Sequence, residues 1–244
     1  MTQTSSSPPP YKTSPAIPMG HTMPLNTTAA TSNSETGASA DDISLDKDIL
    51  RSQIRPRRLI NRSNRAEAGQ ADYARRYQEG IYSLIPRTGE KLTIAAYLPT
   101  AAEPPITDAL QQLHHDGHRI LVPVVRPART LAWVIWDPQV EHPLNGLGIA
   151  EPEGEEYDTQ AFVAADLRLV PALAYARNGR RLGQGGGYYD RIIPTLAADK
   201  LRESTVGVVF SHEVLESIPY DEWDAVLPRV LTENGIEPLG DSAL

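Results

Sequence analysis

The strongest chemical pattern in the sequence is a segment that concentrates glycine, arginine and one carboxylate, Arg177-Asn-Gly-Arg-Arg-Leu-Gly-Gln-Gly-Gly-Gly-Tyr-Tyr-Asp-Arg191. Because glycine has no Cβ, successive main-chain N–H groups of such a segment can converge on phosphate oxygens. A helix that begins near Gly187 would add its positive end. The segment lacks the Gly-Lys-Ser/Thr ending of a P-loop, and Tyr188 stands where a dinucleotide fingerprint has its third glycine. The residues alone therefore predict a phosphate-binding loop, with a flexible glycine turn between solvated arginines as the alternative.

The elements that must position this loop are predicted from residue 92 onward. Short apolar runs rich in β-branched residues alternate there with helical or turn segments, which predicts an α/β fold with a mostly parallel sheet. The expected strands are residues 92–98, 119–125, 131–136, 167–172, 205–210 and 226–231. A helix through Ile106, Leu110 and Leu113, ended by Gly117, joins the first two strands as a βαβ unit. The Pro-, Gly- and Glu-rich stretch 137–157 predicts a long loop.

Two helices are expected before the first strand. Ile43, Leu50 and Ile54 recur at helical spacing, but Pro56 predicts a kink or break little more than a turn after Arg51. The second helix is expected to begin near Asn64, with Glu67 completing a capping box, and to run as far as residue 86.

Length and composition bound the domain organisation. Ser, Thr and Pro make up 21 of the first 40 residues of a 244-residue chain, so we expect residues 1–41 to form a disordered tail and residues 42–244 a single domain. The chain has no cysteine, which excludes disulfides, thiolate metal sites and cysteine nucleophiles. It has no secretory signal pattern and no run of about 20 apolar residues, so we expect a soluble, cytoplasmic protein that does not bind membranes.

Net charge argues against nucleic acid as a partner. The formal charge is −8 at pH 7, which opposes non-specific binding to DNA or RNA. Arginine is nevertheless dense between Arg51 and Arg76, and this stretch could form a local positive surface. A nucleic-acid-associated module therefore remains an alternative, to be tested by salt-dependent retention on immobilised DNA or RNA.

Six blocks of the sequence resemble, in the same order, the motifs of one enzyme family. The blocks are Asp46–Arg51, Tyr97–Glu103, Gly117–Val125, Gly148–Pro152, Arg181–Asp190 and Glu222–Glu233. The most specific is Arg-Leu-Gly-x-Gly-x-Gly-Tyr-Tyr-Asp, which follows a predicted strand ending in Pro-x-Leu-Ala. These blocks resemble 5-formyltetrahydrofolate cyclo-ligases, also called methenyltetrahydrofolate synthetases. The resemblance covers roughly residues 46–234.

The resemblance implies a three-layer α/β/α domain with a mostly parallel sheet, similar to the sugar-isomerase and CoA-transferase folds. It implies an ATP- and Mg²⁺-dependent conversion of 5-formyltetrahydrofolate to 5,10-methenyltetrahydrofolate, with release of ADP and phosphate. The formyl oxygen is a poor leaving group, and its phosphorylation would turn it into a good one. The protein would supply positioning and charge stabilisation. An ATP- and folate-binding homologue without cyclo-ligase activity is the alternative. The partner would be the small-molecule substrate, and the protein a monomer or weak homo-oligomer.

The resemblance also implies roles for individual residues. Lys47 and Arg181 would be catalytic, and Lys47 and Arg51, four residues apart on one helical face, could both reach a polyphosphate. The expected ATP-binding residues are Lys47, Arg51, Arg181, Leu182, Gly183, Gln184, Gly185, Gly186, Gly187, Tyr188 and Tyr189. Leu98 and Glu103 would bind the folate, and Asp190 and Asp224 would hold Mg²⁺. Without the resemblance, a solvated basic face, a helix carboxylate and an exposed turn acid are the ordinary interpretations of the cationic pair and the two aspartates.

Overall fold

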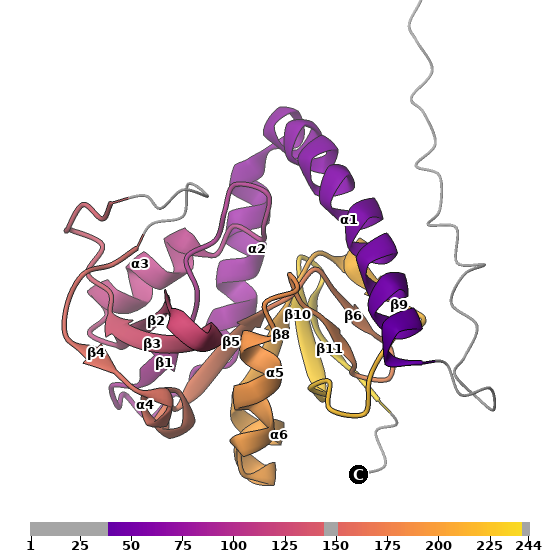
Figure 1. Cartoon of the computed structure of the whole chain (residues 1–244). Helices are drawn as coiled ribbons and strands as arrows, with labels where there is room; N and C mark the ends of the chain where they lie inside the picture. Colours follow the sequence, from indigo (N-terminus) through magenta and orange to yellow (C-terminus); the bar gives the residue numbers. More distant parts are fainter. Residues whose placement is uncertain (1–38, 144–150, 241–244) are drawn as a thin grey trace, which may run out of the picture. The chain divides into compact units, whose positions relative to one another are not determined.

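The main sheet has eight strands in a computed structural model that describes residues 39–143 and 151–240 (Figure 1). Its order is β11-β10-β8-β5-β1-β2-β3-β4, and the five strands from β10 to β2 run parallel. The edges are antiparallel, because β11 pairs with β10 at one end and β3 and β4 extend the other. A second sheet has the order β7-β6-β9. The expected mostly parallel sheet is confirmed.

The strands are β1 Thr93–Ala95, β2 Arg119–Arg126, β3 Thr130–Ile135, β4 Glu156–Tyr157, β5 Leu167–Pro171, β6 Ala174–Ala176, β7 Arg181–Leu182, β8 Thr205–Val208, β9 Val214–Leu215, β10 Arg229–Thr232 and β11 Gly235–Pro238. The α-helices are α1 Ala40–Ala68, α2 Gln70–Tyr82, α3 Thr107–His115, α4 Thr159–Ala164, α5 Tyr188–Ile192 and α6 Ala198–Ser204. The short 3-10 helices among the described residues are η2 Pro127–Arg129, η3 Ile193–Thr195 and η4 Ser211–Glu213. None of the described helices combines the length and the apolar character that a membrane span requires.

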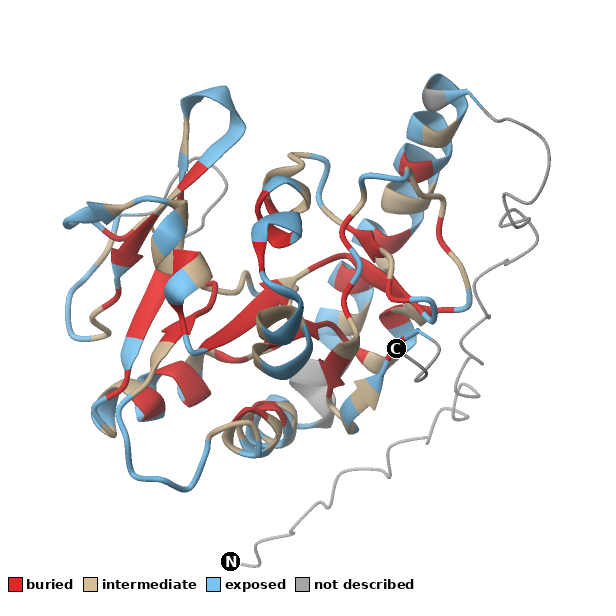
Figure 2. Ribbon diagram, turned by 90° about the horizontal axis from the view of Figure 1, so that it is seen from below, coloured by how far each residue is buried: buried red, intermediate tan, exposed pale blue. Residues whose placement is uncertain are grey.

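Helices cover both faces of the main sheet, because its strands are apolar on both sides. Ile94 of β1 belongs to a core cluster shared with α2 and α3, whereas the next residue, Ala95, belongs to a cluster shared with α4 and α5. Strand residues alternate between the two faces in this way because successive side chains of a strand point in opposite directions. Figure 2 shows the central strands as buried. The expected three-layer α/β/α arrangement is therefore confirmed.

Pro56 does not break helix α1, which continues to Ala68, so the expected interruption was wrong. Proline removes one main-chain hydrogen bond, the one to the carbonyl of Ser52, and its ring crowds that carbonyl. Pro56 and Ser52 are both exposed, so water can satisfy the freed oxygen. Contacts of Arg51 and Arg58 with the rest of the protein hold the helix on either side of the proline.

The division between the first two helices lies at Gly69, not near Asn64. Gly69 has a φ of 107°, a left-handed conformation that favours glycine, and it ends α1 and begins α2. The expected capping box at Asn64 is wrong because Asn64 lies inside α1. Downstream, α2 presents Tyr77 and Ile81 to the core.

Several strands are shorter or displaced relative to the expected ranges. The last expected strand, residues 226–231, is observed as β10, which begins three residues later and ends one residue later. The expected loop 137–157 ends in the two-residue strand β4, and residues 144–150 lie outside the described part of the chain. Part of the Gly148–Pro152 block therefore also lies outside it.

Arg168 of β5 is a fully buried cation that binds main-chain oxygens rather than a carboxylate. Its Nε donates to Phe162 O at 2.8 Å, and Nη2 donates to Val163 O and Ala165 O, both at 2.5 Å. Its Nη1 donates to Ser204 Oγ at 2.9 Å. The last carbonyls of a helix have no partners within the helix, so Arg168 caps α4 and ties it to the end of α6.

We expect Arg168→Met to lower the free energy of unfolding by about 3 kcal/mol or more, because several buried carbonyls lose their donors at once. Urea denaturation measures this change. Arg76→Met is the matched control, since Arg76 forms an exposed ion pair with Asp72 on α2 and its loss should cost less than about 1 kcal/mol. Equal effects of the two substitutions would contradict the capping role of Arg168.

A second prediction concerns the start of α1. Ser39 caps this helix, and its side chain and that of Asp42 form a capping box. The helix begins at Ala40, so a truncation that removes residues 1–38 keeps the cap, whereas one that removes residues 1–41 deletes it. We expect the first truncation to leave the melting temperature unchanged and the second to cost up to about 1 kcal/mol. A large loss from the first truncation would refute the expectation that residues 1–38 are dispensable for folding.

Candidate active site

Residues 183–187 form a loop between β7 and α5, and arginines from α1 and α5 bind its carbonyl oxygens. The contacts are Arg51 Nε to Gly183 O (3.0 Å), Arg55 Nη2 to Gln184 O (2.8 Å), and Arg191 Nη1 to Gly186 O and Gly187 O (both 3.3 Å). Arg55 and Arg191 remain exposed to solvent, but their guanidinium groups still bind the loop. The glycine loop is therefore anchored by its carbonyl groups.

The main-chain N–H groups of the same loop make no such contacts. Within residues 39–143 and 151–240, no hydrogen bond has an N–H group of residues 183–187 as its donor. Gly185 and Gly187 adopt left-handed φ values of 105° and 65°, which a side chain would strain. The carbonyl oxygens of this loop accept hydrogen bonds from arginines, and its N–H groups remain available as donors. This is the arrangement that an anion cradle requires.

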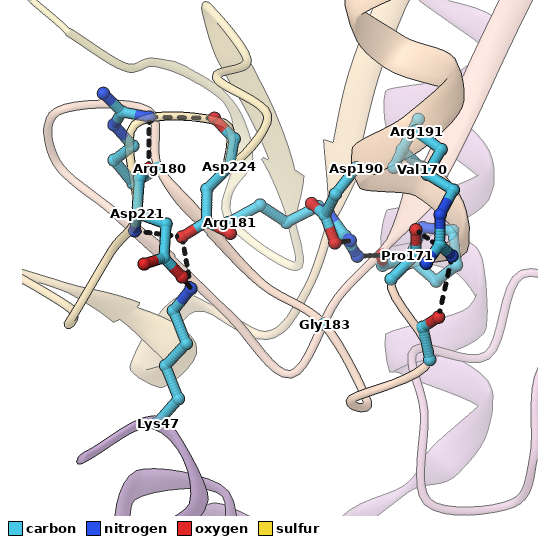
Figure 3. A network of polar contacts seen from close by, with 12 residues as sticks. Lys47, Val170, Pro171, Arg180, Arg181, Gly183, Asp190, Arg191, Asp221 and Asp224 are labelled. Atoms are coloured by element: carbon cyan, nitrogen blue, oxygen red, sulfur yellow. Dashed lines mark hydrogen bonds and ion pairs between the residues drawn. The ribbon is translucent and has the colours of Figure 1, made fainter. Parts of the chain in front are cut away.

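Arg181 lies beneath this loop in a buried ion pair with Asp190 (Figure 3). Its Nη2 is 2.6 Å from Asp190 Oδ2, and its Nη1 donates to Pro171 O at 3.2 Å. Burial opposes the charge of the guanidinium, but the neighbouring Asp190 outweighs burial, so the pKa of Arg181 is raised. The guanidinium also packs against Gly183, where a Cβ would lie 2.8 Å from Nη2. The structure thus brings the predicted residues Arg181, Gly183 and Asp190 together.

Lys47 binds two aspartates on the turn that precedes β10. Its Nζ is 2.6 Å from Asp221 Oδ2 and 2.6 Å from Asp224 Oδ2, and the lysine side chain is only 9% exposed. Arg180 supports the turn from its other side, with Nη1 donating to Asp221 O at 3.2 Å and to Asp224 O at 2.8 Å (Figure 3). A predicted phosphate-binding cation and a predicted metal ligand are therefore bound to each other.

A cavity of about 110 Å³ joins the glycine loop to the acid that follows β1. Glu103 lines it together with Arg181, Tyr188 and Tyr189, among others. Glu103 is held within its own turn, because its Oε2 accepts from Thr100 N at 2.8 Å and from Thr100 Oγ1 at 3.0 Å. The structure places the predicted folate-binding acid beside the predicted phosphate loop.

Leu98, the other residue expected to bind the folate, is half-buried against the core cluster shared with α2 and α3. This position fits an apolar packing role equally well. Its contact with a ligand stays a prediction.

Arg58, which the sequence did not single out, connects α1 to three loops at this edge of the sheet. Its Nε and Nη2 bind Glu213 Oε1 and Oε2 at 2.6 and 2.8 Å, and Nη2 also donates to Ala172 O at 2.6 Å. Its Nη1 lies 3.8 Å from Glu103 Oε1. Burial opposes the charge of Arg58, but Glu213 and Glu103 outweigh it and raise the pKa.

Two residues that line the cavity carry a buried polar atom without a hydrogen-bond partner in the described part of the chain, Arg181 Nε and Tyr189 OH. Asp190 Oδ1, Tyr97 OH and Trp133 Nε1 are also unpaired but belong to residues outside the lining. Burial and the nearby charge of Glu103 raise the pKa of the Tyr97 phenol well above its usual range. Buried polar groups are normally paired, so unpaired ones that gather in one place mark where the polar groups of a ligand are expected.

The predicted metal ligands fit a magnesium ion in their chemistry. Asp190 and Asp224 each use Oδ2 in an ion pair and each have an Oδ1 without a hydrogen bond among the described residues. The described residues contain no group of three or more side chains that could hold a metal by themselves. Mg²⁺ does not require one, since it commonly takes one or two carboxylates and completes its shell with phosphate oxygens and water.

The sequence contained an unused signal for the residues that were missed. Lys47, Arg51, Arg55 and Arg58 occur at i, i+4, i+8 and i+11, which places all four on one face of a helix. Because Pro56 predicts an interruption of that helix, the predicted basic face ends at Arg51 and leaves out Arg55 and Arg58. Asp221, three residues before Asp224, was missed because nothing in its neighbourhood indicates a partner as distant in sequence as Lys47.

Comparisons with known proteins give a consistent result. The model of the 5-formyltetrahydrofolate cyclo-ligase family matches residues 44–233. A 5-formyltetrahydrofolate cyclo-ligase from Mycolicibacterium smegmatis is 33% identical over 190 residues, which cover 75% of this chain and 93% of the relative. One from Escherichia coli K12 is 32% identical over 146 residues, covering 59% and 79%. The solved structure of Aquifex aeolicus 5,10-methenyltetrahydrofolate synthetase aligns with a TM-score of 0.59 at 27% identity, covering 80% of this chain and 95% of that one.

We expect Gly183→Ala to weaken anion binding. The new Cβ would meet the end of the Arg181 side chain, 2.8 Å from Nη2, so the guanidinium must shift, and the shift disturbs its pair with Asp190. Calorimetric titration with inorganic tripolyphosphate should show at least about tenfold weaker binding, the loss expected for one charge-assisted hydrogen bond.

Gly80→Ala is the control for this prediction, because its Cβ would also meet a flexible side chain, that of Leu231, on helix α2. It should leave tripolyphosphate binding unchanged. Unchanged binding in Gly183→Ala as well would show that the position of Arg181 does not matter for anions.

Proposed function

Because the chain belongs to the 5-formyltetrahydrofolate cyclo-ligase family, a family of ligases, we propose that it converts 5-formyltetrahydrofolate to 5,10-methenyltetrahydrofolate with cleavage of ATP to ADP and phosphate. The observation that carries the proposal is the shared cavity: a glycine loop with available N–H donors and a buried arginine faces the acid that follows β1. A loop suited to phosphate and a carboxylate suited to the pterin ring of the folate would thus line the same cavity.

The reaction needs an activated formyl oxygen, because an amide oxygen is a poor leaving group. Transfer of the γ-phosphoryl group of ATP to that oxygen would break the bond between the γ-phosphorus and its bridging oxygen and release ADP. Attack of the folate N10 on the formyl carbon would then close the ring, and the oxygen would leave as phosphate. The protein would hold the two substrates in line and stabilise the transferring charge.

The glycine loop and the cations around it are suited to the polyphosphate. Main-chain N–H groups of residues 183–187 would donate to phosphate oxygens, and Arg181, fixed by Asp190, would present a guanidinium of known orientation. Lys47 lies on the same face of α1 as Arg51, which contacts the glycine loop. Lys47 would exchange an aspartate for a phosphate oxygen as its partner when ATP binds.

Glu103 is suited to the donor edge of an aminopyrimidine ring. Its Oε2 is fixed by Thr100, so the carboxylate has one orientation in the cavity. Mg²⁺ would be held by Asp190 and Asp224 and would neutralise charge on the phosphates. The composition supports a cytoplasmic protein, and we propose a monomer or weak homo-oligomer without nucleic-acid partners.

The arginine-rich stretch offers little support for a nucleic-acid surface. Arg51, Arg55 and Arg58 bind the protein's own loops, and Arg75 and Arg76 form ion pairs with acids of α2. Cations already paired within the protein contribute less to a field that attracts phosphate backbones.

The proposal is tested by the absorbance of the methenyl product when purified protein meets 5-formyltetrahydrofolate, with ATP and Mg²⁺ each omitted in turn. We expect product only when both are present, with one ADP formed per product. Protein without Mg²⁺ should still bind the folate, because Glu103 is independent of the metal. ATP and folate binding without product would instead identify a homologue that lacks cyclo-ligase activity.

A further inference from the structure

Arg58 occupies a position that neither the glycine loop nor the acidic turn explains. It lies on α1, 11 residues after Lys47 and about three helical turns further along the same face. Its side chain is 4% exposed. It does not line the cavity, so it would not touch either substrate.

The contacts of Arg58 gather three neighbouring strands. Ala172 follows β5, Glu213 follows β8, and Glu103 lies in the loop after β1, and these three strands are adjacent in the order β8-β5-β1. Parallel strands bring their carboxyl ends to one edge of the sheet, where ligands bind in open α/β proteins. One guanidinium of α1 therefore reaches three neighbouring loops at that edge.

The donors of Arg58 are divided in a particular way. Nε and Nη2 are used by Glu213 and by the carbonyl of Ala172, which leaves the two N–H groups of Nη1 on the side of Glu103. Among the residues that the structure describes, Arg58 is the one cation within 4.0 Å of the Glu103 carboxylate. Thr100 holds Oε2 of that carboxylate, and Arg58 faces Oε1.

We propose that Arg58 is a positioning residue for the folate: it fixes the carboxylate of Glu103 and thereby joins the folate subsite to the helix that carries Lys47 and Arg51. The inference rests on the proposed function and deepens it. The basic residues from Lys47 to Arg58 contact, in succession along α1, the acidic turn, the glycine loop and Glu103. One rigid helix would therefore position the binding sites of both substrates.

The decisive variant is Arg58→Lys, which keeps the positive charge but replaces the planar guanidinium, with its several N–H donors, by a single ammonium group. An ammonium group donates from a single point and cannot serve Glu213, the Ala172 carbonyl and Glu103 together. We expect the KM for 5-formyltetrahydrofolate to rise about tenfold, as for the loss of one close contact between largely buried opposite charges, while the KM for ATP stays within about twofold. Arg62→Lys, at an exposed position one turn further along α1, should change neither constant.

A double-mutant cycle shows whether Arg58 acts through Glu103. Glu103→Gln alone should raise the folate KM, and adding Arg58→Lys to it should raise the folate KM no further. If Arg58→Lys does not fold, the double variant R58Q/E213Q replaces both buried charges by amides, so that neither is left unpaired, and it should show the same selective rise. Melting temperatures of all variants separate a loss of folding from a loss of positioning.

Three results would overturn the proposal: an unchanged folate KM in Arg58→Lys, equal rises in both KM values, or an effect of Arg58→Lys that persists in the Glu103→Gln background. Wild-type protein is measured first in the same assay. Absence of product there would refute the proposed function, and equilibrium binding of 5-formyltetrahydrofolate to the same variants would then decide the role of Arg58. Wild-type protein that neither turns over nor binds the folate would refute both.

Discussion

Helix α1 is attached to the protein through its cations, and the arrangement of the site depends on this attachment. Among its described side chains only Ile54 is a buried apolar residue, whereas Leu45, Leu59 and Ile60 are each about 60% exposed. Apolar contact is tolerant of rotation and sliding, but hydrogen-bonded ion pairs are directional. A helix held by Lys47, Arg51, Arg55 and Arg58 therefore has a defined rotation about its axis and a defined register along it.

The cost of this attachment is the removal of several charges from water. Lys47 and Arg58 are nearly buried, and each is stabilised by two carboxylates rather than one. Each of these two cations keeps one carboxylate partner when the other carboxylate turns to a new partner, so the ion pairs can be exchanged without leaving a charge unpaired.

The parallel sheet explains why residues far apart in the sequence meet. The loops after β1, β5 and β8 bring Glu103, Ala172 and Glu213 to one edge, and the second sheet carries the glycine loop over it. The loop then divides its polar groups: carbonyls bind arginines of α1 and α5, and N–H groups remain available. The fold thus presents a group of available N–H donors on one loop, as an anion cradle requires.

The sequence by itself determined the class of fold, the glycine loop and the acid after β1, because each leaves a local signal. Short apolar runs predict a buried parallel sheet, and glycines at successive positions predict that the main chain can approach a ligand closely. The acid after β1 was recognised from a block of sequence that resembles a motif of the family. The break expected at Pro56 was wrong because a lost hydrogen bond on an exposed helix face is satisfied by water, which local propensity does not register.

Only the tertiary structure decided which charges meet. Lys47 pairs with Asp221 and Asp224 across more than 170 residues, and Arg58 pairs with Glu213 across 155. The residues concerned carry no mark of these partners, because a lysine or a glutamate has the same local preferences whether it is solvated or buried in a pair. Their partners follow from strand order, which brings distant loops to one edge, and that order is a property of the folded sheet.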